Sequence, residues 1–365
     1  MRPVRESTGE PSSDDPVRDF ARVCPGRVVS SPRPAEADRH SQLGSYLESW
    51  AVWATDPDTR FRGASGGVLT ALSLWLTQSG RAATVFGAGP DANPSRTVSV
   101  RITDRETAMA AAGSRYGPVA ALASSGALDP RNAVITKPCE ASALDRLLKE
   151  RGEEERPLIL SFFCAGVPSQ HATDDLVREL GVPDGEELTG LRYRGSGWPG
   201  RFTATTASRE VSTDYRTSWG DRLGPTVQWR CKICPDGVGE SADLAACDYW
   251  ETDENGYPLF EEGDGRSGLL VRTERGREVL HAAMEAGVLE GQRIAAPGIA
   301  AVQPGQTWRR ENVWGRLVGA RLAGRRVPRY LGFPLRRLAL EDPRRTVRAI
   351  RGSRRRARAS AVKGS

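Results

Sequence analysis

Short apolar runs and longer amphipathic stretches follow one another along most of the 365-residue chain. Apolar, β-branched runs bounded by polar segments are typical of buried strands, whereas apolar positions three or four apart are typical of helices. The pattern predicts strands over residues 43–54, 82–88, 97–102, 133–139, 158–164, 190–198, 202–211, 240–250 and 267–273. It predicts helices over residues 106–112, 141–149, 169–180, 215–223 and 276–286, and one that ends near residue 78.

Two of these strands set the expected topology. Residues 133–139 and 158–164 are each followed by a helix-compatible segment, which makes two βα units of a parallel sheet. We therefore expect an α/β fold with a mainly parallel sheet core, covering helices and added β-hairpins. The carboxyl ends of parallel strands meet at one edge of a sheet, so residues that end these two runs are expected to lie together.

Four of the six cysteines are placed where they could share a metal site. Cys139 and Cys164 end the two predicted parallel strands, and Cys231 and Cys234 form a Cys-x-x-Cys pair followed by proline. A loop carrying this pair over the strand ends would complete four thiolates, which suit an iron–sulfur cluster or a structural zinc. Because only one pair is close in sequence, the pattern favours a cluster. The alternative is that Cys139 and Cys164 are ordinary buried cysteines.

Two loops of small residues are candidate cofactor contacts. The first contains Ser65, Gly66 and Gly67, and it opens an apolar helix that includes Thr70. Backbone N–H groups at such a helix start form an anion site suited to phosphate. The sequence is neither a Gly-x-Gly-x-x-Gly motif nor a Walker loop, and a tight turn with close helix packing is the alternative. The second loop, residues 113–118, adds a cation and an aromatic ring to small residues.

Composition places the chain among globular intracellular proteins. The hydrophobic fraction is 38% and no apolar run approaches the roughly 18 residues of a membrane span. The first 16 residues are charged and lack the apolar stretch of a secretory signal. Six cysteines in this arrangement fit metal binding in a reducing compartment better than disulfides. We therefore expect a cytoplasmic protein.

The basic charge is concentrated at the C-terminus. From Arg321 onward, fourteen arginines and one lysine face two acids, whereas the whole chain carries +6, so the remainder is net acidic. Three interpretations stand: solvated disorder, attraction to an anionic membrane surface, or nucleic-acid binding. No base-reading motif accompanies the charge, so peripheral membrane contact or an acidic partner is favoured and nucleic acid is not expected.

Seven ordered motifs between about residues 41 and 300 resemble the beta-subunit family of coenzyme F420 hydrogenases and dehydrogenases. The motifs are residues 65–70, 113–116, 137–139, 163–169, 231–236, 240–243 and 248–250. The resemblance implies an α/β flavoprotein whose FAD or FMN lies next to a 4Fe-4S cluster. It supports Cys139, Cys164, Cys231 and Cys234 as cluster ligands. The flavin contacts that it implies lie in the two small-residue loops and are Ser65, Gly66, Gly67, Thr70, Ser114, Arg115 and Tyr116.

Departures from the family pattern refine this expectation. Only Cys24 stands where many relatives carry a ferredoxin module, so a second cluster is not expected. Lys137 replaces a threonine and Cys247 replaces a glycine of the commoner forms. The turn at residues 194–200 and the Lys137–Cys139 segment resemble stand-alone members associated with polysaccharide or secondary-metabolite pathways. F420 is then one candidate substrate beside a small organic molecule.

Three charged residues near these motifs are candidates for catalysis. The charge of Lys137 could stabilise reduced flavin or an anion near the cluster, and the alternative is a surface salt bridge. Asp248 and Glu240 are candidate proton donors, and the alternative is that they cap turns. A Cys164–His171 nucleophile would leave the other three cysteines without a role and is not favoured.

The sequence thus predicts an iron–sulfur flavoprotein oxidoreductase that receives electrons from a donor such as ferredoxin or a reduced deazaflavin. The expected regions are a partly disordered extension (1–40), the first part of a flavin-binding α/β region (41–130), an iron–sulfur and flavin domain (131–300) and a basic extension (301–365). Two rival functions are an electron-transfer subunit without its own substrate and a zinc-stabilised binding protein.

Overall fold

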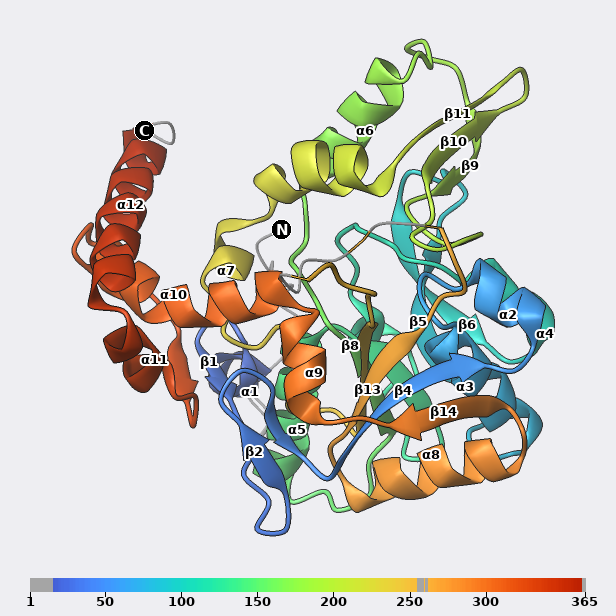
Figure 1. The fold of residues 1–365 in the computed structure, drawn as a ribbon, viewed down its shortest axis with the longest axis horizontal. Helices are drawn as coiled ribbons and strands as arrows, with labels where there is room; N and C mark the ends of the chain where they lie inside the picture. The colour runs from blue at the N-terminus through green and yellow to red at the C-terminus, as the bar shows by residue number, and fades with distance from the viewer. Residues whose placement is uncertain (1–15, 255–258, 260–261, 363–365) are drawn as a thin grey trace.

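An eight-stranded sheet forms the centre of the computed structural model, which describes residues 16–254, 259 and 262–362 (Figure 1). Its strand order is β14-β4-β13-β12-β8-β7-β5-β6. The strands are β4 (Glu48–Ala54), β5 (Val85–Pro90), β6 (Thr97–Ile102), β7 (Ala133–Thr136), β8 (Leu158–Phe162), β12 (Leu244–Asp248), β13 (Ser267–Val271) and β14 (Leu289–Arg293). The neighbours β5, β7, β8 and β12 run parallel, and antiparallel strands flank them. The predicted α/β class with a parallel core is therefore confirmed.

Alternating side chains of the strands build a core on each face of the sheet. On one face Leu244 and Leu269 pack in a cluster with helices α3 (Val68–Gln78) and α8 (Glu274–Glu285). On the other face Val134 and Ile159 pack against α5 (Pro138–Arg151). Burial of both faces explains why the parallel strands are almost continuously apolar. Helices α4 (Arg105–Ala110) and α9 (Ala296–Ala301) extend the two layers.

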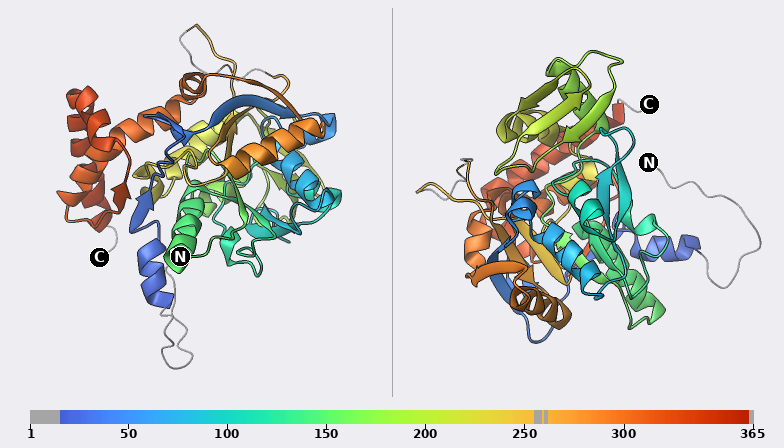
Figure 2. Two further views of the ribbon diagram at one scale, coloured as in Figure 1. Left: turned by 90° about the horizontal axis from the view of Figure 1, so that it is seen from below. Right: turned by 90° about the vertical axis from the view of Figure 1, so that its right-hand side faces the viewer.

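A separate three-stranded sheet forms a small lobe next to the central sheet. Its strands β9 (Leu188–Arg192), β10 (Phe202–Thr206) and β11 (Glu210–Thr213) form an antiparallel sheet. They share an apolar core with α6 (Gln170–Glu179) and η2 (Arg216–Leu223), as the top of the right-hand view in Figure 2 shows. The β10–β11 hairpin divides what the sequence pattern predicts as one strand over residues 202–211. The predicted helix over 215–223 is present with π-type hydrogen bonding.

Several predicted strand ends are wrong by a few residues. The strand predicted over 133–139 stops at Thr136, because Pro138 opens helix α5 and places Cys139 in its first turn. The strand predicted over 43–54 divides into β3 (Gly44–Tyr46), which pairs with β2 (Asp38–His40), and β4. The strand predicted over 240–250 is limited to β12.

The arginine-rich C-terminal segment is folded as far as residue 362. Helix α10 (Pro304–Arg321) packs along α12 (Pro343–Val362), and both lie at the edge of the molecule beside α11 (Leu335–Glu341) (Figure 1). The close contact uses two glycines of α10, since a Cβ at Gly319 would lie 2.3 Å from the Ile350 carbonyl oxygen, and a Cβ at Gly315 would lie 2.8 Å from that of Thr346. The interpretation of this segment as solvated disorder is therefore wrong for the described residues.

The N-terminal segment lies at the same edge of the molecule as the C-terminal helices. Strand β1 (Val28–Ser30) pairs in parallel with β15 (Arg329–Leu331), and α1 (Pro16–Val23) contacts α5. Residues 1–15, for which the sequence predicts disorder, lie outside the described part of the chain. The remaining short elements are α2 (Pro57–Arg62), η1 (Ala121–Ala123), η3 (Gly224–Thr226) and α7 (Trp229–Lys232). None of the described helices combines the length and apolar character needed to cross a membrane.

Candidate functional site

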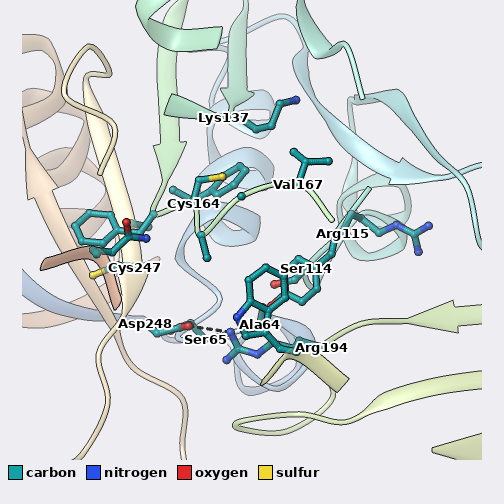
Figure 3. Close-up of a pocket in the computed structure, with 18 of the residues that line it drawn as sticks. Ala64, Ser65, Ser114, Arg115, Lys137, Cys164, Val167, Arg194, Cys247 and Asp248 are labelled. Carbon is teal, nitrogen blue, oxygen red and sulfur yellow. Dashed lines mark hydrogen bonds and ion pairs between the residues drawn. The ribbon is translucent and has the colours of Figure 1, made fainter. Parts of the chain in front are cut away.

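A cavity of about 1120 Å³ lies at the carboxyl ends of the parallel strands (Figure 3). It is larger than a typical ligand pocket of roughly 300–1,000 Å³, so it has room for more than one bound group. The segment after β4 reaches the same cavity, because β4 is antiparallel to β13, which is antiparallel to β12, and β4 therefore points the same way as the parallel strands. The predicted site residues in its wall are Ser65, Gly67, Thr70, Ser114, Arg115, Tyr116, Lys137, Cys164, Cys231 and Asp248.

A backbone hydrogen bond joins the end of β8 to the segment after the Cys-x-x-Cys pair, and a second one lies within the pair. The Cys164 N–H donates to the Gly237 carbonyl oxygen at 2.8 Å, and the Cys234 N–H donates to that of Cys231 at 3.2 Å. Gly166 permits the close approach, since a Cβ there would lie 3.0 Å from the Cβ of Cys231, and its φ of 127° favours glycine. The cysteine loop thus lies over the strand end, as the sequence pattern predicts.

The four predicted ligand cysteines act electrostatically on one another. Burial raises the pKa of the Cys164 thiol to about 12, with further increments from Cys139 and Cys231. Burial also raises the pKa of Cys234 to about 12, and Cys139 contributes there as well. Electrostatic interactions thus link the Cys139 thiol to each of the other three. Among the described residues, however, no three His, Cys, Asp or Glu side chains lie close enough to hold a single metal ion.

Two arginines that the sequence interpretation missed flank these thiols. Arg230 interacts with Cys139 and Cys234 and opposes the rise in the Cys139 pKa that burial causes. Arg309, from α10, donates to the carbonyl oxygens of Cys164 at 2.7 Å and Ala165 at 3.1 Å. Arg230 is visible beside Cys231 in the sequence, but Arg309 comes from a distant helix and has no local signal.

The two remaining cysteines occupy different surroundings. Cys247 is buried and packs with Leu270 and Ile299, and burial raises its pKa well above the usual value. Cys24 lies in the N-terminal segment next to Arg230, because a Cβ on Gly26 would be 3.4 Å from Cys24 Sγ and 3.7 Å from Arg230 Nε. Cys24 thus lies closer to the four-cysteine cluster than its isolated position in the sequence indicates.

Asp248 lies in a salt bridge at the cavity wall. Its Oδ2 accepts a hydrogen bond of 2.8 Å from Arg194, whose side chain is 3% exposed (Figure 3). The Arg194 guanidinium lies over the rings of Tyr215 at 4.7 Å, Trp198 at 5.3 Å and Trp250 at 5.4 Å. The Asp248 carboxylate is thus held at the cavity wall by an ion pair with a buried guanidinium.

Lys137 and Glu240, the other two candidate catalytic residues, differ in their access to the cavity. Lys137 lies in the wall, where its Nζ donates to Glu140 Oε1 at 2.8 Å and to the Val119 carbonyl oxygen at 2.7 Å. Glu240 is buried outside the wall, in an ion pair with Arg310 and a hydrogen bond with Ser31. This placement gives Glu240 a structural environment and no contact with the cavity.

Two polar groups of the first small-residue loop already have hydrogen-bond partners within the protein. The Gly66 N–H donates to Ser267 Oγ at 3.0 Å, and the Ser65 hydroxyl donates to the Arg266 carbonyl oxygen at 2.6 Å. Gly67 caps α3 with a φ of 70°. Residues 67–70 at this helix start line the cavity, whereas Gly66 does not.

The residues of the second small-residue loop differ in how they face the cavity. The Arg115 guanidinium donates to the carbonyl oxygens of Leu191, Pro94 and Arg96 at 2.9, 2.7 and 2.7 Å and points away from the cavity in Figure 3. Tyr116 packs against the ring of Trp219 at 4.8 Å, and burial raises its pKa. All three residues, Ser114, Arg115 and Tyr116, line the cavity wall, but the Arg115 guanidinium is engaged in anchoring the loop.

Known proteins are similar to this chain in sequence and in fold. The model described as coenzyme F420 hydrogenase/dehydrogenase, beta subunit N-term, matches residues 49–125, and its C-terminus counterpart matches residues 129–296. The coenzyme F420 hydrogenase subunit beta of Methanococcus voltae is 24% identical over 301 residues, which cover 78% of this chain and 99% of the relative. A chain of the F420-reducing NiFe hydrogenase complex from Methanosarcina barkeri has the same fold, with a TM-score of 0.61 and 19% identity over 81% of this chain and 99% of that chain. The protein therefore belongs to the coenzyme F420 hydrogenase/dehydrogenase beta subunit family, a family of oxidoreductase subunits.

Proposed function

We propose that this protein is an iron–sulfur flavoprotein oxidoreductase in which a 4Fe-4S cluster and a flavin (FAD or FMN) lie side by side. The observation that carries the proposal is the shared wall of one cavity, which contains Cys164 and Cys231 together with the helix start from Gly67 to Thr70. When bound, flavin would exchange a hydride with substrate and single electrons with the cluster.

The four cysteines fit a cluster better than a single ion. Thiolate sulfurs on a 4Fe-4S cube sit roughly 6 to 7 Å apart, wider than around one zinc. Electrostatic interactions link the Cys139 thiol to the other three thiols. Arg230 and Arg309 place positive charge beside them, which would stabilise thiolates and the negative charge of a reduced cluster.

The cavity wall also contains residues that would bind a flavin. The helix-start amides from Gly67 to Thr70 would hold a phosphate, because unpaired N–H groups and the helix dipole both favour an anion there. Lys137 would supply positive charge near the strand ends, held in place by Glu140. The Arg194–Asp248 pair would present a fixed dipole, braced by Trp250, to the group bound beside it.

The substrate in this proposal is a small organic molecule or F420, and the donor is a ferredoxin or a reduced deazaflavin in the cytoplasm. A stand-alone role in polysaccharide or secondary-metabolite biosynthesis follows from the resemblance of the 194–200 turn. The names of the relatives, which are hydrogenase subunits, favour a second candidate function, that of an electron-transfer subunit docked on a partner.

Anaerobic purification with a visible spectrum tests the cofactor content. A cluster gives a broad band near roughly 400 nm and flavin adds peaks near about 370 and 450 nm, whereas zinc gives neither. Acid release of the flavin then separates FAD from FMN. Oxidation of reduced F420 by the isolated chain with an artificial acceptor would favour the enzyme, and activity only after a partner is added would favour the electron-transfer subunit.

A further inference from the structure

A second groove, of about 430 Å³, lies where α10, β15 and α11 meet, at the left-hand edge of the molecule in Figure 1. The described residues that line it are all different from those that line the large cavity. The rings of Trp314 and Phe333 and the side chains of Leu317 and Leu335 give it an apolar floor. Leu331, which is 41% exposed, adds apolar surface to the same groove. The groove is therefore an apolar recess outside the proposed cofactor cavity.

Four arginines line the same groove. Arg321 comes from α10, Arg329 from β15, and Arg336 and Arg337 from α11, and all four are exposed. The described lining contains no acid. Arg337 pairs with Glu341 at 3.5 Å, but such an exposed ion pair contributes little, and the other three arginines form no ion pair with a described acid. The groove therefore carries an excess of positive charge beside its apolar floor.

The floor of the groove continues into the Cys-x-x-Cys pair. Ile233, which lies between Cys231 and Cys234, is 2% exposed and shares one apolar cluster with Leu317 and Tyr330. Tyr330 also lines the groove. Burial raises the pKa of the Tyr330 hydroxyl, and the nearby thiols of Cys234 and Cys231 raise it further. A molecule bound in the groove would thus be separated from the cysteine pair by this apolar cluster.

We propose that the groove between α10, β15 and α11 is the docking surface for a small acidic electron-carrier protein of the ferredoxin class. Aromatic and arginine side chains are enriched in protein interfaces, and a basic patch selects an acidic partner. A recessed apolar floor admits a protruding side chain of a protein, whereas a flat bilayer would contact only the rim. The inference rests on the proposed function, whose electron donor it places, and it assigns these arginines a protein partner rather than a membrane.

Calorimetric titration of the anaerobically purified full-length protein with an oxidised plant-type ferredoxin at low salt tests the docking surface. We expect saturable binding that weakens with salt and becomes at least tenfold weaker when Arg329→Glu and Arg336→Glu are combined. The matched control combines Arg354→Glu and Arg355→Glu, which makes the same change in net charge on exposed residues outside the groove. Binding like the wild type in the control supports the groove. An equal loss in both double variants, or no loss in the groove variant, would overturn the proposal.

Electron delivery gives a second readout. In each encounter one electron would leave the reduced ferredoxin and enter the cluster, and no proton or group would be transferred. In stopped-flow mixing we expect the rate with reduced ferredoxin to fall at least tenfold in the groove variant. The rate with dithionite, a small reductant that needs no docking surface, should stay the same. An equal fall with both reductants would overturn the docking role.

Iron and flavin contents of the same samples separate this inference from the proposed function. A wild-type protein that holds neither iron nor flavin would refute the proposed function, whether or not it binds ferredoxin. A wild-type protein that holds both cofactors but does not bind ferredoxin would overturn the docking surface alone. Unchanged ferredoxin binding with lost binding to anionic vesicles in the groove variant would also overturn it.

Discussion

The Cys164 N–H donates a hydrogen bond of 2.8 Å to the Gly237 carbonyl oxygen, and this bond fixes the end of β8 to the loop that follows Cys231 and Cys234. Cys164 follows the buried strand β8, and the other two cysteines lie in and just after helix α7, more than sixty residues later. Their placement together depends on a small number of backbone contacts.

The buried side chain of Asp236 accepts hydrogen bonds from the segment that follows the Cys-x-x-Cys pair. Its Oδ1 accepts from the N–H groups of Val238, Gly239 and Glu240 at 3.2, 2.9 and 3.2 Å. Asp236→Ala leaves these buried donors without their acceptor, so we expect the free energy of unfolding to fall by about 2–4 kcal/mol. Denaturant titration measures the loss. Asp236→Asn keeps a carbonyl acceptor and should lose clearly less, and equal losses in both would contradict the role of the hydrogen bonds.

Gly66 and Thr70 should respond differently to substitution. A Cβ at Gly66 would lie 2.6 Å from the Val52 carbonyl oxygen, so we expect Gly66→Ala to lower stability by about 1–3 kcal/mol. Thr70→Val removes only a hydroxyl at the cavity wall and should weaken flavin binding about fivefold, the equivalent of one hydrogen bond. Melting temperature and flavin titration separate the two effects. A stable Gly66→Ala protein that has lost flavin would instead restore Gly66 to the phosphate site.

The buried thiols predict a pH dependence of cluster assembly. The pKa values of Cys164 and Cys234 are raised to about 12, and a metal binds thiolates rather than thiols. Protons therefore compete with iron below that pH, and binding should strengthen as the pH rises from 7 to 9. Chelator competition during anaerobic reconstitution measures this, together with the protons released. Affinity that stays constant over this range would contradict protonated thiols in the apoprotein.

Removal of residues 335–365 should damage the site rather than leave it intact. Leu335 packs in one apolar cluster with Val313, Leu317 and Ile233, the residue before Cys234. Truncation would expose this cluster, so we expect lower thermal stability and lower iron content. Replacing the exposed Arg354 and Arg355 by alanine keeps the packing and is the suitable variant for vesicle co-sedimentation. A stable, iron-replete truncated protein would show that the segment is dispensable.

The sequence pattern predicts features that depend on residues close together in the chain. Apolar periodicity located seven of the eight strands of the central sheet and missed β14, whose sequence is mostly polar. The position of Cys139 and Cys164 after two of the strands led us to expect them near the Cys-x-x-Cys loop. Long-range partners were not predictable in this way. Arg309 reaches the cysteines, and Arg310 pairs with Glu240, only because α10 folds back across the loop. The spacing of apolar residues after Arg321 follows a helical face only in part, and the packing of α12 depends on glycines in another helix.

The iron content of cysteine variants shows whether Cys231 is a cluster ligand. The wild type and Cys231→Ser are purified anaerobically beside Cys247→Ser, whose thiol packs with Ile299. We expect about four irons and four sulfides per chain in the wild type and in Cys247→Ser, and a loss of most iron in Cys231→Ser. Stoichiometric zinc without iron in the wild type, or unchanged iron in Cys231→Ser, would contradict this expectation.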